Sequence, residues 1–189
     1  MTDLPFSSQA VVPQESVETN DHALRFGGIR RLYGTRAYER FRTAHVVVVG
    51  VGGVGSWTVE ALARSGIGKL TLIDLDDVCV SNVNRQLHAL DGTVGRPKVE
   101  VLAERCRAIQ PVIEVVEDIA FATPTNLAER IPEDADHLVD AIDSVVAKAA
   151  LISWFKRRKL PITVTGAAGG QTDPTRIRVA DLARTEHDP

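Results

Sequence analysis

A run of valines that ends in a glycine-rich loop constrains the fold of this chain more than any other feature. Residues 46–57 read VVVVGVGGVGSW. Four consecutive β-branched residues favour a strand that is buried on both faces, as in parallel sheets. The glycines that follow permit a tight turn into a helix whose first N–H groups can approach a phosphate. The stretch therefore predicts a phosphate-binding turn between a central strand and a helix.

Strand-like and helix-like stretches alternate over the rest of the chain. Strand patterns cover residues 46–50, 69–74, 112–117, 137–143 and 161–166, and helix patterns lie between them at 56–66, 96–109 and 144–159. This alternation is typical of βαβ units. We therefore predict an α/β, Rossmann-like fold, with a mostly parallel sheet and helices on both faces. The last 20 residues predict only one further short strand.

The N-terminal residues differ from this pattern. Residues 1–20 mix Pro, Ser, Gln, Glu and Thr without periodicity, so we expect a disordered tail there. A basic, helical arm is expected over residues 21–44, where six arginines accompany two acidic residues. The chain has 189 residues, of which 44% are hydrophobic and 25% charged, so residues 21–189 are sufficient for one folded domain.

The cysteines and the hydropathy exclude several classes of protein. Cys79 and Cys106 form no CxxC motif, which argues against a disulfide framework and against a zinc knuckle. No apolar run approaches the roughly 20 residues that span a bilayer, and the first residues lack the features of a signal peptide. We expect a soluble, cytoplasmic chain without a membrane segment.

Asp74 extends the glycine signal into a nucleotide site. Three of the glycines fit the spacing GxGxxG, and Asp74 ends the next predicted strand, where its carboxylate can accept hydrogen bonds from both ribose hydroxyls. A glycine turn in an α/β core without any ligand is the structural alternative. By themselves, these residues would suit NAD as well as ATP.

The segment after Asp74 favours ATP. It reads DLDDVCVSNVNRQ, which places Arg85 in a polar loop, and Lys98 begins the next predicted helix. A triphosphate needs cations in addition to backbone N–H groups, whereas a dinucleotide pyrophosphate is usually held by the helix N-terminus alone. The alternatives are a solvated loop arginine and a surface lysine on a helix.

A carboxylate completes the predicted site. Asp143 ends the predicted strand 137–143, at the carboxyl edge where open α/β sheets bind ligands. An aspartate there suits Mg²⁺ bound between phosphates, because Mg²⁺ takes few protein ligands. The structural alternative is a helix cap without a metal.

Five motifs occur in order: GxGGxG, LIDxD, SNxNRQ, GxPK and a strand that ends in Asp. Together they resemble the adenylating domain of ubiquitin-activating-type enzymes, which include bacterial activators of sulfur carriers. The resemblance implies that residues 21–189 form an ATP-binding adenylating domain with Arg85, Lys98 and Asp143 as catalytic residues and Asp143 as the Mg²⁺ ligand. The implied ATP-binding residues are Gly50, Gly52, Gly53, Gly55, Asp74, Asp76, Asn82, Asn84, Arg85, Gln86 and Lys98.

Residues 25–34, 137–152 and 166–189 resemble one branch of that family. That branch uses ATP to dehydrate, and so cyclise, the threonylcarbamoyl group of a modified adenosine beside the anticodon of tRNA, by adenylation of the threonyl carboxylate. Its known members continue beyond the position that matches Pro189, so the resemblance implies that a C-terminal part is missing here. Basic residues in the arm and in the stretch KRRK at 156–159 could contact tRNA phosphates, and KRRK could equally be a solvated helix end.

The resemblance also implies partners. It suggests a homodimer in which an arginine of the N-terminal arm reaches the ATP of the other subunit. Sulfur-carrier activators show RYxRQ there, but the position of its second arginine is Gly28 here, so Arg25 and Arg31 are the candidates, together with Arg30. Some family members work beside cysteine desulfurases, so such a system is an implied partner.

Two alternative functions stay open from the residues alone. One is adenylation of the C-terminus of a ubiquitin-like sulfur carrier protein, and the other is a non-catalytic module that binds a nucleotide.

The cysteines are not expected to take part in the reaction. Cyclisation of the threonylcarbamoyl group requires no cysteine nucleophile, and Cys106 has the spacing of a helix core position relative to Val99 and Leu102.

Overall fold

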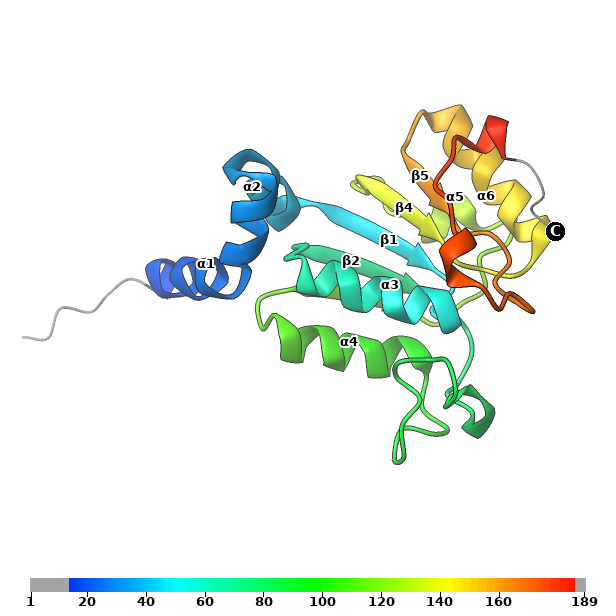
Figure 1. The fold of residues 1–189 in the computed structure, drawn as a ribbon, viewed down its shortest axis with the longest axis horizontal. Helices are drawn as coiled ribbons and strands as arrows, with labels where there is room; N and C mark the ends of the chain where they lie inside the picture. Colours follow the sequence, from blue (N-terminus) through cyan, green and yellow to red (C-terminus); the bar gives the residue numbers. More distant parts are fainter. Residues whose placement is uncertain (1–13, 186–189) are drawn as a thin grey trace, which may run out of the picture.

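Two helices precede the sheet. The computed structural model describes residues 14–185, and it begins with α1 (Gln14–Tyr33) and α2 (Thr35–Thr43), which project from one end of the molecule (Figure 1). Gly34, with φ at +83°, separates them. Residues 14–20, which the sequence assigned to the tail, are part of α1. Residues 1–13 lie outside the described residues.

Five parallel strands form one sheet in the order β3-β2-β1-β4-β5. The strands are β1 (His45–Val49), β2 (Lys69–Ile73), β3 (Glu114–Asp118), β4 (His137–Asp140) and β5 (Ile162–Val164). The central strand, β1, pairs with β2 on one side and with β4 on the other. The strand order therefore reverses at β1, which is where open α/β sheets form a ligand crevice.

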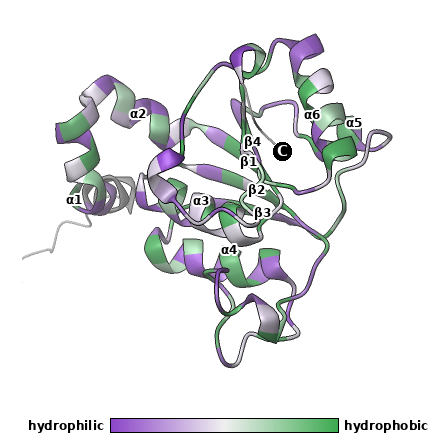
Figure 2. Ribbon diagram, turned by 45° about the vertical axis from the view of Figure 1, so that its right-hand side comes forward, coloured by the Kyte–Doolittle hydropathy of each residue, from purple (hydrophilic) through white to green (hydrophobic). Residues whose placement is uncertain are grey.

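Helices cover both faces of the sheet, so the predicted Rossmann-like fold is confirmed. The helices α3 (Gly53–Arg64) and α4 (Lys98–Ile109) lie on one face, and α5 (Leu127–Arg130) and α6 (Val145–Arg158) lie on the other (Figure 1). Val46 and Val48 pack in the α3–α4 core, whereas Val47 and Val49 pack in the α5–α6 core. The helices combine hydrophobic and hydrophilic residues, as the colours of Figure 2 show.

Two predicted strand assignments were wrong. Strand β4 ends at Asp140, because the chain turns away towards α6 after the Ala141 N–H group donates to the Val49 carbonyl (2.8 Å). The described residues after Val164 contain no strand, only the short 3₁₀ helices η2 (Pro174–Arg176) and η3 (Leu182–Arg184). Among residues 14–185, no helix has the length and apolar character needed to cross a membrane.

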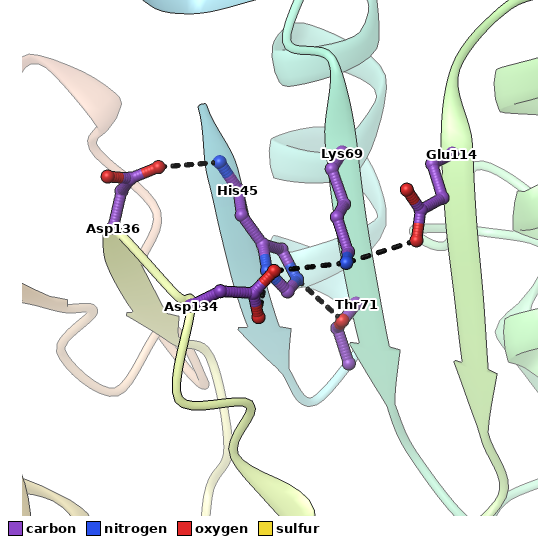
Figure 3. A network of polar contacts seen from close by, with 6 residues as sticks. All are labelled: His45, Lys69, Thr71, Glu114, Asp134 and Asp136. Atoms are coloured by element: carbon purple, nitrogen blue, oxygen red, sulfur yellow. Dashed lines mark hydrogen bonds and ion pairs between the residues drawn. The ribbon is translucent and has the colours of Figure 1, made fainter. Parts of the chain in front are cut away.

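A polar network ties the amino ends of the strands together (Figure 3). In β1, His45 lies between Asp134, 3.0 Å from its Nδ1, and Thr71 of β2, 2.8 Å from its Nε2. The Nζ atom of Lys69 pairs with Glu114 (3.0 Å) and with Asp134 (3.1 Å). Burial lowers the pKa of His45, although Asp134 opposes this effect. The network therefore joins the strands at the amino edge of the sheet, opposite the glycine loop. It does not occupy the carboxyl edge, where open α/β sheets bind ligands.

Candidate nucleotide-binding site

The glycine loop joins β1 to α3 at the centre of the carboxyl edge. Gly50 has φ at +81°, and a Cβ atom there would lie 2.9 Å from the carbonyl group of Ala141. A Cβ atom on Gly55 would overlap the carbonyl oxygen of Gly50. Gly52 is the N-cap of α3 and offers no side-chain acceptor to its first N–H groups. The loop therefore presents backbone donors at a helix N-terminus, which is an anion-binding arrangement.

Asp74 connects the loop after β2 to the glycine loop. Its Oδ2 atom accepts a hydrogen bond from the Val51 N–H group (2.7 Å), and its Oδ1 atom accepts one from the Asp76 N–H group (2.9 Å). The predicted ribose contact stays a prediction. The carboxylate is in the predicted place, at the end of the strand next to β1.

Asn82 shapes the polar loop that carries Arg85. Its buried side chain accepts a hydrogen bond from the Cys79 N–H group (3.0 Å) at the 3₁₀ helix η1 (Val80–Asn82), and its backbone carbonyl accepts from the N–H groups of Arg85 and Gln86. Trp57 of α3 donates its Nε1–H to the Arg85 carbonyl (3.1 Å). The loop is therefore docked on the helix that begins at the phosphate turn.

Arg85 and Gln86 lie directly over the glycines. The Cγ and Cδ atoms of Arg85 lie 3.6 Å from the position of a Cβ atom on Gly53, and Nε2 of Gln86 lies 3.7 Å from that position on Gly52. Asn84 accepts a hydrogen bond from Arg85 (3.0 Å). Within the described residues, Arg85 has no carboxylate partner, and the buried Oε1 atom of Gln86 has no hydrogen-bond partner. The structure thus brings a cation to the predicted phosphate position.

Lys98 is buried rather than solvated. Only 5% of the residue is exposed, and its Nζ atom lies 2.7 Å from the Oδ2 atom of Asp76. Its backbone N–H also donates to the Asp76 carbonyl (3.0 Å). The alternative of a surface lysine is therefore wrong. Asp76 orients the ammonium group, and the role of Lys98 as a second cation of the site stays a prediction.

His88 is a buried neighbour of Lys98 that the sequence patterns did not single out. The residue is 1% exposed, and neither ring nitrogen has a hydrogen-bond partner among the described residues. Burial, with a contribution from the positive charge of Lys98, lowers the pKa of His88 to about 4. The imidazole is therefore neutral at physiological pH.

Acidification is expected to destabilise the domain through His88. Its pKa is about 4 in the folded protein, below the ordinary value of 6.5 that holds in the unfolded chain, so its contribution is complete above pH 6.5 and is lost as the pH falls through 4. We expect a loss of about 2 kcal/mol between about pH 7.5 and pH 5. Urea unfolding of the wild type and of His88→Gln at both pH values measures this loss. The difference between the two proteins isolates His88, because the other histidines contribute equally to both. Identical pH profiles would contradict the prediction.

Asp143 lies in the loop between β4 and α6, three residues after the end of the strand. It is exposed, and Ser144, not Asp143, caps α6 by accepting a hydrogen bond from the Ala147 N–H group (3.4 Å). The alternative of an Asp143 cap is therefore wrong. No group of three or more His, Cys, Asp or Glu side chains within residues 14–185 is arranged to hold a metal by itself. A single exposed carboxylate fits Mg²⁺ whose other ligands are phosphate oxygens and waters.

A pocket of about 320 Å³ borders the same loop. It lies between the segment after β3 and the first turn of α6, and its lining is mostly apolar. The lining residues are Phe121, Ala122, Thr123, Pro124, Ser144, Val146 and Ala147. Such a pocket suits a flat, apolar ring system.

The candidate arginines of the arm lie away from this site. Arg25 bonds to Asp21 (2.6 Å) and to the carbonyl of Ile109 (3.3 Å), at the end of α4 and therefore near the amino edge of the sheet. Arg31 is exposed on α1. Arg25 thus helps to dock the arm on its own chain, whereas Arg30 and Arg31 are both exposed on α1 and stay candidates for contact with another subunit.

The cysteines have different environments. Cys106 is fully buried in the α3–α4 core, and burial raises the pKa of its thiol to about 12, which confirms the predicted packing role. Cys79 is exposed.

The parallel sheet, the helices on both of its faces and the glycine turn beside Arg85 define a Rossmann-like α/β domain. Residues 28–186 match the ThiF family, and the chain belongs to that family. It is 56% identical over 165 residues to the tRNA threonylcarbamoyladenosine dehydratase of Escherichia coli K12, an alignment that covers 87% of this chain and 62% of the relative. It is 37% identical over 130 residues to the molybdopterin-synthase adenylyltransferase of the same organism, covering 69% and 51%.

A solved structure shows the same fold. The crystal structure of the E. coli tRNA N6-threonylcarbamoyladenosine dehydratase in complex with ATP has a TM-score of 0.86 and 56% identity, over 88% of this chain and 69% of that chain. The chain thus spans about three fifths of the length of the curated dehydratase.

Proposed function

We propose that residues 21–189 form the ATP-binding adenylating domain of an enzyme that dehydrates threonylcarbamoyladenosine in tRNA. The observation that carries the proposal is the placement of Arg85 over the glycine turn at the strand-order reversal, with buried Lys98 linked to that turn through Asp76 and Asp74. The 56% identity to a dehydratase over most of this chain supports the choice of substrate. The alignment covers 62% of that relative, so the complete dehydration activity is part of the proposal.

The residues suggest how ATP would lie. The phosphates would face the start of α3, between Arg85 and Lys98, and Asp74 would accept hydrogen bonds from the ribose. The apolar pocket beside Phe121 would accept the adenine ring. Asp143 would hold Mg²⁺ on the phosphates and so add positive charge where the leaving group develops negative charge.

The chemistry requires alignment more than it requires a nucleophilic side chain. The threonyl carboxylate attacks the α-phosphate of ATP, and pyrophosphate leaves. A nearby atom of the same threonylcarbamoyl group then attacks the activated carbonyl carbon, which closes the ring and releases AMP. Arg85 and Lys98 would bring two anions together and neutralise the charge that develops. The buried thiol of Cys106 takes no part in these steps.

The proposal includes a homodimer in the cytoplasm. The projecting arm of α1 and α2 supports it, because Arg31 is exposed there and could reach the ATP of a second subunit (Figure 1). A cysteine desulfurase system is a further proposed partner. Sedimentation analysis of the wild-type protein and of Arg31→Ala tests the dimer. If Arg31→Ala stays dimeric, a change in its rate of AMP release reports the contribution of the arginine to catalysis.

AMP release from ATP with threonylcarbamoyl-tRNA tests the function. Asp143→Asn is expected to lower the rate about 100-fold, because it removes the proposed Mg²⁺ ligand. Glu133→Gln is the matched control, since Glu133 is exposed near the amino edge. An active Asp143→Asn enzyme would remove the metal role of Asp143.

The identity to molybdopterin-synthase adenylyltransferase favours one second candidate, the adenylation of a sulfur carrier protein. ATP–pyrophosphate exchange that depends on a carrier, with none on modified tRNA, would select this candidate. Tighter binding of NAD than of ATP, without turnover, would instead select a non-catalytic nucleotide-binding module.

The basic end of α6 provides a test of tRNA binding. Lys156, Arg157 and Arg158 lie about 20 Å along the helix from its start beside Asp143, and Arg158 stacks over Trp154 at 4.1 Å. Replacing all three by alanine is expected to weaken tRNA binding and to lower the slope of log affinity against log salt by about two. Arg107→Ala, on the opposite face of the sheet, should change the slope by less than about one. An unchanged slope in the triple variant would contradict a tRNA contact there.

A further inference from the structure

An ion pair between a buried aspartate and a partly buried lysine lies beneath the loop that carries Asp143. Asp140, the last residue of β4, has 0% exposure, and its Oδ2 atom lies 3.1 Å from the Nζ atom of Lys148 on α6. The Oδ1 atom of the same carboxylate accepts a hydrogen bond from the Ile142 N–H group (3.1 Å). The carboxylate therefore holds both the helix and the first turn of the loop.

Lys148 also contacts the segment that leaves β5. Its Nζ atom donates to the Thr165 carbonyl (3.0 Å), while the Thr165 N–H and hydroxyl groups donate to the Asp140 carbonyl (2.9 and 3.1 Å). Three pieces of chain thus meet at one ammonium group: the end of β4, the first turns of α6 and the end of β5. All three border the carboxyl edge of the sheet.

The loop held in this way contacts the phosphate turn. Ala141 and Ile142 fill the space at Gly50, where a Cβ atom would lie 2.9 Å from both residues, and Asp143 follows them. A shift of residues 141–142 would therefore change the space around Gly50 and the position of Asp143 together. A buried ion pair adds little stability relative to apolar residues of similar volume, but its hydrogen bonds have defined directions.

We propose that Lys148 is a positioning residue for the nucleotide, because it holds the 141–143 loop against the glycine turn and fixes the segment after β5 beside it. This inference rests on the ATP-binding function proposed above. It assigns Lys148 no contact with ATP. Its effect would pass through residues 141–143.

Two measurements on Lys148→Met test the inference in the whole protein. The first is hydrogen exchange without nucleotide: amides 141–143 and 165–167 should exchange at least about tenfold faster, while those of β1 and β2 stay unchanged. The second is ATP affinity by calorimetry, which should fall about tenfold. Lys148→Arg, which keeps the charge and the donors, should recover most of both effects. Arg178→Met, at an exposed position outside the contacts of Lys148, should show neither.

The outcomes separate this inference from the proposed function. If the wild type fails to bind ATP, the proposed function fails, whereas the exchange data still report on the contacts of Lys148. Unchanged exchange in the loop, an ATP affinity within about twofold of the wild type, or a uniform rise in exchange across the sheet would overturn the positioning role. Should Lys148→Met not fold because Asp140 is left as an unpaired buried charge, the double variant Asp140→Asn/Lys148→Met removes that charge and is judged by the same criteria.

Discussion

Gly55→Ala is expected to lower the free energy of unfolding by about 3 kcal/mol and to abolish ATP binding. The added methyl group would overlap the carbonyl oxygen of Gly50, and it would also meet the Ala141 side chain at 3.3 Å. Backbone atoms cannot move aside as a flexible side chain can. Either α3 or the phosphate turn must therefore shift. Urea unfolding and calorimetry with ATP measure the two effects.

Gly53→Ala is the matched control for this prediction. Gly53 lies in the same first turn of α3, but a Cβ atom there meets only the Arg85 side chain at 3.6 Å, which is an ordinary contact. Alanine also favours the helix over glycine, so the free energy of unfolding should change by less than about 1 kcal/mol, or rise. If both variants unfold at the same urea concentration, the close approach of Gly55 to Gly50 has no energetic importance.

Lys98→Gln is expected to reduce kcat/KM for AMP release by about 10²- to 10³-fold. Lys98 is one of the two cations proposed to bind the phosphates, and Asp76 holds its ammonium group at 2.7 Å. The carboxylate of Asp76 is more than half exposed, so it stays hydrated when its partner is removed and the fold should survive. Steady-state kinetics with ATP as the varied substrate measure the effect, and circular dichroism checks the fold.

Arg96→Gln provides the comparison for Lys98. Arg96 lies two residues earlier and pairs with Glu104 on α4, on the exposed surface. Its loss removes the same charge without changing the phosphate turn, so kcat/KM should stay within about threefold of the wild type. Similar losses in both variants would show a general effect of net charge rather than a phosphate contact of Lys98.

The central strand and the site around it could be predicted from local patterns. Four valines next to glycines at the GxGxxG spacing constrain the backbone without any information from the rest of the chain, because only glycine tolerates φ at +81° and the contact at Gly55. The structure places Arg85 beside Gly53 and buries Lys98 against Asp76, and their role as cations of one site stays a prediction. The loop that carries Arg85 and the helix that begins at Lys98 both follow β2 and return to its carboxyl end.

Strand ends and helix starts were harder to predict. The stretch HLVDAID has the apolar pattern of a strand up to Asp143, yet β4 ends at Asp140, where the chain turns towards α6 and the Ile142 N–H group and Lys148 bind the Asp140 carboxylate. Helix α5 has only four residues, which is too short for a periodic signal. At the end of the described chain, exposed Ile177 and Val179 have the alternation of a strand but no neighbouring strand among the described residues with which to pair.

Local patterns were enough to predict five strands, three of the helices between them and the glycine turn after the first strand, because backbone sterics and hydrophobic periodicity act over a few residues. Three features became clear only in the folded chain: β4 ends at Asp140 rather than Asp143, Lys98 and His88 are both buried, and Arg25 binds the carbonyl of Ile109 on its own chain. These features depend on contacts between residues that are distant in sequence. Packing of the sheet and its helices brings these residues together, so no local sequence pattern predicts the contacts.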